Sequence, residues 1–118
     1  MTLDLDRVDA AWLAGLLDGE GCFDAPRGNP RVRVKMTDFD VILRAADLMQ
    51  AKTHPEIVPD RKPLLVAQIT GEPAVAVLHA ILPFLGSRRS ARATEIIVAQ
   101  RQKAARHPAR RLTLASAA

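Results

Sequence analysis

Residues 12–23 read WLAGLLDGEGCF. The stretch begins as an apolar helix and ends in the tetrapeptide DGEG, which places the carboxylates of Asp18 and Glu20 at the helix C-terminus. A helix concentrates partial negative charge at that end, so two acids there are unfavourable unless another group offsets them. The rest of the sequence therefore has to supply a basic neighbour, a bound cation or both.

Small residues recur at helical spacing along the same segment. They would allow the backbone of another helix to approach closely, or they could form a seam inside the core of a single chain. Both interpretations remain open from the pattern alone. The residues concerned are Ala11, Ala14, Gly15 and Asp18.

Beyond this helix the sequence predicts alternating hairpins and helices. The first helix is expected over residues 9–17, with Asp6 or Asp9 as its N-cap. Strands follow over residues 22–25 and 31–37, joined by turn-forming residues that include Asn29. The remaining elements are a helix over 40–51, strands over 55–61 and 64–70, and helices over 74–82 and 88–106.

The strand RVRVKMT, residues 31–37, alternates strictly between basic and apolar side chains. The strand at residues 64–70 is expected to direct Leu65, Ala67 and Ile69 inward and Gln68 outward. These patterns predict an α+β fold with one four-stranded, mostly antiparallel sheet, helices on one face and an unusually basic opposite face. The basic face would carry Arg31, Arg33 and Lys35.

Length and composition indicate one domain, expected over residues 1–107, followed by a mobile tail at 108–118. No apolar run approaches the length of a membrane helix, and the N-terminus lacks the pattern of a signal peptide. The single cysteine excludes an intramolecular disulfide framework. We therefore expect a cytoplasmic protein with no membrane partner that is not secreted.

Charge is divided unequally along the chain. Residues 1–24 carry a net charge of −5, whereas residues 25–118 carry +9. A polyanionic partner and a separate site for cations would explain this division, although a solvated basic surface would explain it equally well. Aromatic residues make up only 3% of the chain, which argues against base stacking on an aromatic platform.

The segment LAGLLDGEG, residues 13–21, resembles the nine-residue signature of the LAGLIDADG homing endonucleases. It departs from that signature at Leu17, Gly19 and Glu20. The family has the order αββαββα, which the predicted elements match. Because the chain has one copy of the signature, the resemblance implies a homodimer that packs two signature helices together, through Ala11, Ala14, Gly15 and Asp18.

The resemblance also implies a catalytic site for Mg²⁺ or Mn²⁺. Glu20 matches the metal-binding acid of the signature, and the carbonyl of Gly19 matches a secondary ligand. Asp38 matches a polar position near the reactive water, and Arg88 matches a basic residue near the scissile phosphate, where the family often has Lys. Asp18 matches a position that is more often structural than metal-binding.

The implied activity is site-specific, metal-dependent cleavage of double-stranded DNA at a long pseudo-palindromic target. The alternative is a non-cleaving DNA- or RNA-binding protein of the same type, acting as a transcription regulator or an intron maturase. Candidate DNA-binding residues lie on the basic sheet face, in its turns and in the last helix. They are Asp24, Arg27, Asn29, Arg31, Arg33, Lys35, Arg61, Lys62, Gln68 and Arg89.

Overall fold

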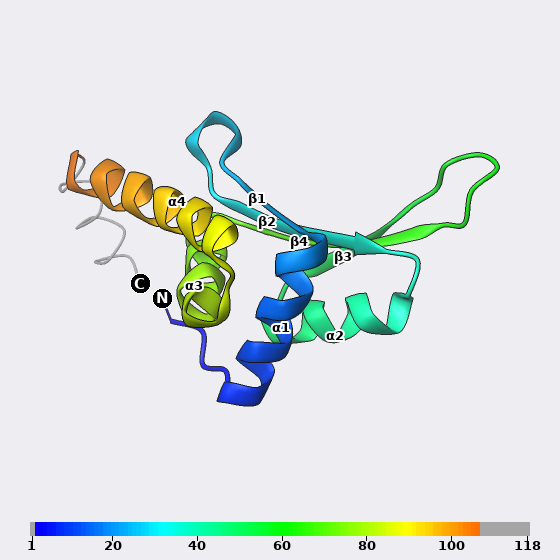
Figure 1. Ribbon diagram of the computed structural model, residues 1–118. Coiled ribbons are helices and arrows are strands. Elements are labelled where there is room, and N and C mark those ends of the chain that lie inside the picture. The colour runs from blue at the N-terminus through cyan, green and yellow to red at the C-terminus, as the bar shows by residue number, and fades with distance from the viewer. Residues whose placement is uncertain (1, 107–118) are drawn as a thin grey trace.

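The computed structural model describes residues 2–106 and contains four α-helices, four strands and two short 3₁₀ turns among them (Figure 1). The α-helices are α1 (Arg7–Glu20), α2 (Phe39–Met49), α3 (Glu72–Ile81) and α4 (Ser87–Arg106). The strands are β1 (Gly21–Asp24), β2 (Arg31–Met36), β3 (Lys52–Glu56) and β4 (Leu64–Thr70).

The strands form one sheet in the order β1-β2-β4-β3, and every neighbouring pair is antiparallel. Helices α1, α2 and α3 cover one face, as expected from the sequence (Figure 1). The β1–β2 and β3–β4 hairpin loops rise on the opposite side, at the two ends of the curved sheet (Figure 1). The α+β fold class and the element order predicted from the sequence are confirmed.

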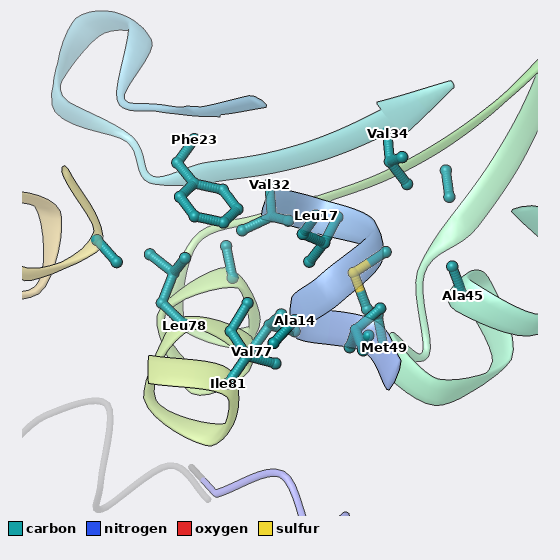
Figure 2. Close-up of a cluster of buried hydrophobic side chains, with 14 of the residues drawn as sticks. Ala14, Leu17, Phe23, Val32, Val34, Ala45, Met49, Val77, Leu78 and Ile81 are labelled. Carbon is teal, nitrogen blue, oxygen red and sulfur yellow. The ribbon is translucent and has the colours of Figure 1, made fainter. Parts of the chain in front are cut away.

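The core lies between the sheet and the helices that cover it. Phe23, Val32 and Val34 project from β1 and β2 toward Leu17 of α1 and Leu78 of α3 (Figure 2). From β4, Leu65 and Ala67 join the core and Ile69 packs against it, as predicted. Burial of these side chains supplies the main driving force for folding, at about 25 cal/mol for each Å² of apolar surface removed from water.

The two ends of α1 are fixed by different devices. At the N-terminus the side chain of Asp6 accepts a hydrogen bond from the backbone N–H of Asp9 at 2.8 Å, which makes Asp6 the N-cap. At the C-terminus the N–H of Gly21 bonds the carbonyl of Leu17. A Cβ atom at Gly21 would lie 2.8 Å from that carbonyl oxygen, so only glycine fits where the helix passes into β1.

The third strand was predicted in the wrong place. It occupies Lys52–Glu56 instead of residues 55–61. Gln50 adopts a left-handed conformation, with φ of 56°, and ends α2 early enough for the chain to enter the sheet at Lys52. Residues 57–63 consequently form an exposed loop that includes a second left-handed residue, Asp60.

The other predicted elements have the correct type, with ends displaced by at most three residues. The tail predicted at 108–118, and the domain boundary at residue 107, lie outside the described residues. None of the helices within residues 2–106 has the length and apolar character needed to cross a membrane.

Candidate functional site

The C-terminal turn of α1 is tied to the N-terminus of α4 by one carboxylate. Both oxygens of Asp18 lie within hydrogen-bonding distance of the backbone N–H of Gly86, at 3.1 and 3.0 Å. Gly86 immediately precedes α4, and its carbonyl accepts from the N–H of Ser90 at 2.8 Å. A carboxylate at a helix N-terminus is stabilised by the helix dipole. Asp18 therefore caps α4, which is a structural role.

The same contact brings acidic and basic residues to one corner of the molecule. Glu20 lies two residues beyond Asp18, and Arg88 lies two residues beyond Gly86. Both side chains are exposed. The charge that accumulates at the end of α1 is therefore offset in part by the hydrogen bond from the N–H of Gly86 to Asp18 at the start of α4.

The donors at this corner are of the kind that Mg²⁺ prefers. Glu20 offers an exposed carboxylate, and the carbonyl of Gly19 is among the last four of α1, which have no partner within the helix. Hard oxygen ligands of this kind suit Mg²⁺, which usually retains several waters as well. Within residues 2–106 no three His, Cys, Asp or Glu side chains cluster closely enough to hold a metal.

Asp38 lies at the junction between β2 and α2. It is the N-cap residue of α2, but its side chain makes no capping hydrogen bond and is exposed to solvent. It lies two residues beyond Met36, the last residue of β2, and Val34 of that strand pairs with Gly21 directly after the end of α1. The carboxylate of Asp38 is thus free to contact a ligand at that end of the sheet.

Helix α4 lies along the outer edge of β1. The Nε–H of Arg92 donates to the carbonyl of Phe23 at 3.2 Å, and its Nη1 contacts Glu95 at 3.0 Å. The guanidinium of Arg89 lies 5.5 Å from the centre of the Phe23 ring, and its Nε is buried without a hydrogen-bond partner among the described residues. Arg89 is therefore less accessible to DNA than its sequence position indicates.

The sheet face that α1, α2 and α3 leave uncovered, called here the open face, carries five of the ten predicted DNA-binding side chains. Its strands are in register so that Arg33 pairs with Cys22 on one side and Gln68 on the other. Val66 lies on the open face opposite Lys35 but is buried, unlike the other side chains of that face. In strand order, the residues of the open face are Cys22 and Asp24; Arg31, Arg33 and Lys35; Leu64, Val66, Gln68 and Thr70; and Lys52, His54 and Glu56.

Two ion pairs lie on the open face. Arg31 donates through Nε to Oδ1 of Asp24 at 2.8 Å and through Nη2 to Oδ2 at 2.5 Å. Lys35 makes a single contact with Glu56 at 3.1 Å. The hydrogen bonds from Arg31, assisted by its charge, hold the pKa of Asp24 below the usual value despite partial desolvation. Asp24 is therefore ionised at neutral pH.

The remaining predicted DNA-binding residues lie at the rim of the open face. Arg27 and Asn29 lie in the β1–β2 loop, whereas Arg61 and Lys62 lie in the β3–β4 loop, and all four are exposed. Arg27 adopts φ of 55°, and the loop is closed by backbone hydrogen bonds from Gly28 and Asn29. The described ion pairs leave Arg33 without a carboxylate partner in residues 2–106.

The small-residue surface predicted on α1 is narrower than the sequence indicated. Ala14 is fully buried, beside Val77 and Ile81 of α3 (Figure 2), so it has no surface to offer a second protomer. Ala11 and Gly15, in contrast, are exposed. Ala14 therefore belongs to the core of the single chain. For Ala11 and Gly15, contact with a second helix remains the interpretation.

Sequence reasoning missed Lys52 and His54 on the open face and Arg92 of α4 beside β1. Lys52 and His54 were hidden because the third strand was placed too far along the chain. Arg92 was grouped with a generally basic helix, and only the packing of α4 on β1 brings it to Phe23. The segment KTHPE gave no local signal for Lys52 and His54, because it is almost fully exposed and has no apolar alternation.

Two solved structures of a homing endonuclease have a fold similar to that of this chain. One structure of I-CvuI, in complex with its target Sro1.3 and 2 mM Ca, is 18% identical with a TM-score of 0.65, covering 86% of this chain and 72% of that chain. A second, of I-CvuI with the I-CreI target and 2 mM Mg, in which the DNA is not cleaved, is 18% identical with a TM-score of 0.59. That alignment covers 77% of this chain and 64% of the I-CvuI chain. No family model and no curated protein matches the sequence.

Proposed function

We propose that this chain is a site-specific DNA endonuclease of the LAGLIDADG type, active as a homodimer with Mg²⁺ or Mn²⁺. The observation that carries the proposal is the bond from Gly86 to Asp18, because it joins the corner bearing Glu20 to the helix turn bearing Arg88. The homing-endonuclease fold and the basic open face support the same conclusion. Cleavage, metal use and dimerisation are all part of the proposal.

In the proposed complex the open face follows the major groove of DNA. Side chains two residues apart along β2 point the same way, so Arg33 and Lys35 reach neighbouring positions on the duplex. Arg27 and Asn29 at one end, and Arg61 and Lys62 at the other, extend the contact to more distant nucleotides. A second protomer related by two-fold symmetry would double this contact and require a pseudo-palindromic target.

The proposed chemistry takes place where the two α1 helices end. The exposed residues Ala11 and Gly15 and the half-buried Asp18 face the partner, which brings the Glu20 carboxylates of both protomers toward the two-fold axis. Glu20 and the Gly19 carbonyl would hold the cation, which when bound supplies a lowered water pKa and charge stabilisation on the leaving oxygen.

The other residues of the corner position the reactants. Asp38 accepts a hydrogen bond from the attacking water and orients it toward the phosphorus. Arg88 neutralises charge that develops on the phosphate, and it remains protonated throughout because a guanidinium does not lose its proton at neutral pH. Each protomer would cut one strand across the minor groove and leave a short 3′ overhang.

The test begins with a randomised pool of duplex DNA. Bound duplexes are recovered, sequenced and then incubated with the purified chain in Mg²⁺, in Mn²⁺ or in EDTA. We expect enrichment of a long pseudo-palindrome that is cut with either metal, and that is bound but not cut in EDTA. A selected duplex left uncut with both metals would establish the non-cleaving DNA-binding alternative. Failure to select any sequence would exclude site-specific DNA recognition.

A further inference from the structure

The Asp24–Arg31 ion pair is the most tightly bonded pair of charged side chains on the open face. The two side chains lie opposite each other in the β1–β2 ladder and make two hydrogen bonds. Only 30% of the Asp24 side chain and 25% of that of Arg31 are exposed. The Lys35–Glu56 pair makes one contact and is more exposed, at 45% and 41%. The bidentate geometry fixes both partners before any ligand arrives.

This geometry limits what Arg31 can do. Reading guanine requires an arginine to present two parallel donors to O6 and N7. The Nε and Nη2 donors of Arg31 are directed at Asp24, which leaves the Nη1 protons and the second Nη2 proton for other acceptors. Arg31 can therefore approach guanine only in the orientation that Asp24 imposes, whereas Arg33 on the same face has no such partner among residues 2–106.

The same geometry leaves Asp24 able to accept further hydrogen bonds. An ionised carboxylate offers about four acceptor sites and no donor. Two sites take the hydrogen bonds from Arg31, so the others remain for a group on the open face. Arg33 and Arg92 also lie near enough to favour the ionised form of Asp24. The cluster of Asp24 with these three arginines therefore presents a net positive charge to the phosphates of DNA.

Among base edges in the major groove, cytosine is the best match for an acceptor of this kind. Cytosine presents the N4 amino donor and no acceptor there. Adenine presents its N6 donor beside the N7 acceptor, whereas guanine and thymine present acceptors that would repel a carboxylate. Asp24 can therefore favour one base through attraction and disfavour the others through repulsion.

We propose that Asp24, positioned by Arg31, is a specificity-determining residue that selects cytosine at one position in each half-site of the DNA target. The inference rests on the proposed function, since it assigns a role within the same DNA interface. Arg31 is a positioning residue in this arrangement, and Arg33 is the arginine whose orientation no carboxylate among residues 2–106 fixes.

The test compares the bases selected from a randomised duplex pool by the full wild-type chain and by Asp24→Asn. Asparagine has nearly the same shape but adds a donor, so acceptor bases are no longer repelled. We expect the wild type to select cytosine at one symmetric position and Asp24→Asn to lose about 5- to 150-fold of that preference. Asp47→Asn, which removes the same charge from α2 on the helix side, should keep the cytosine preference.

Arg31→Met separates positioning from direct reading. We expect it to weaken the cytosine preference and to lower affinity for all duplexes, because Asp24 then keeps an uncompensated charge. Loss of a guanine preference in Arg31→Met, with cytosine unaffected, would overturn the proposal. So would an unchanged cytosine preference in folded Asp24→Asn. Absence of any selected sequence with the wild type would overturn the proposed function itself.

Discussion

Asp6 and Asp18 lie near the two ends of α1 and each caps a helix, which gives a direct comparison at the scale of single residues. Asp6 caps α1, and Asp18 caps α4 through Gly86. Replacing either with Ala should lower the free energy of unfolding by about 1 kcal/mol, measured by urea denaturation. Only Asp18→Ala should also reduce DNA cleavage, because only Asp18 fixes the corner that bears Glu20. Equal loss of cleavage in both variants would mean that stability alone was responsible.

Glu20 is predicted to act in cleavage and not in DNA affinity. Glu20→Gln keeps the volume and removes the negative charge that would hold the cation. Cleavage of the selected duplex should fall below detection, whereas the dissociation constant for that duplex in EDTA should change by less than about tenfold, or 1.4 kcal/mol. Glu95→Gln on the exposed side of α4 is the matched control and should cut normally. Undiminished cleavage by Glu20→Gln would remove Glu20 from the site.

The Asp24–Arg31 pair should make stability depend on pH in a defined direction. The hydrogen bonds from Arg31 lower the pKa of Asp24 in the folded chain, relative to 3.8 in the unfolded chain. Their contribution is complete above pH 3.8 and is lost as pH falls through the lowered folded pKa. The difference in unfolding free energy between wild type and Asp24→Asn should therefore shrink below pH 3.8. A difference that is constant with pH would contradict this linkage.

At the scale of elements, the glycines in α1 and at its C-terminal end differ in whether a larger side chain would fit at their position. A Cβ at Gly21 would collide with the carbonyl of Leu17, whereas a Cβ at Gly15 or Gly19 would have no neighbour within 4 Å. Glycine inside a helix costs about 0.5–1 kcal/mol relative to Ala, so Gly15 lowers stability without relieving a clash in the protomer. Close approach of a second helix would account for it.

Substitution at Gly15 tests that explanation. Gly15→Leu should leave the protomer folded and shift the protein from dimer to monomer, as measured by light scattering. Ala99→Leu, on an exposed face of α4, is the control and should leave the dimer intact. A Gly15→Leu variant that remains dimeric would place the protomer contact elsewhere on the molecule.

The elements that the sequence predicted well were those with strong periodicity. In RVRVKMT the alternation predicted β2 and its buried Val32 and Val34. The strand β3 failed because KTHPE is almost fully exposed and shows no apolar alternation. The apolar residues Ile57 and Val58 drew the prediction toward a segment that is an exposed loop, with 77% of Ile57 accessible.

The candidate site could be predicted only in part, for a related reason. The signature placed Glu20 and Asp18 at the end of a helix, but no local pattern indicates that Asp18 meets Gly86. Likewise, the burial of Ala14 and of Val66 depends on which elements pack together in three dimensions. Helical spacing alone could not separate a side chain facing the protomer core from one facing a partner.

For the whole molecule, the proposed assembly has a simple consequence for size. The protein should have a mass near twice 12.8 kDa in light scattering. Its affinity for DNA should fall as salt concentration rises, because basic side chains displace counterions from phosphates. A protein that is monomeric both alone and on its selected duplex would contradict a cation site shared between protomers.

The Asp18–Gly86 contact joins residues that are 68 positions apart in the chain. Of the described elements, α1 leaves the ribosome first and α4 last. The corner proposed to cut DNA therefore cannot form before Gly86 and Arg88 have been synthesised. Partial products that end before Gly86 would thus lack the proposed cleavage corner and could not cut a chromosome through it.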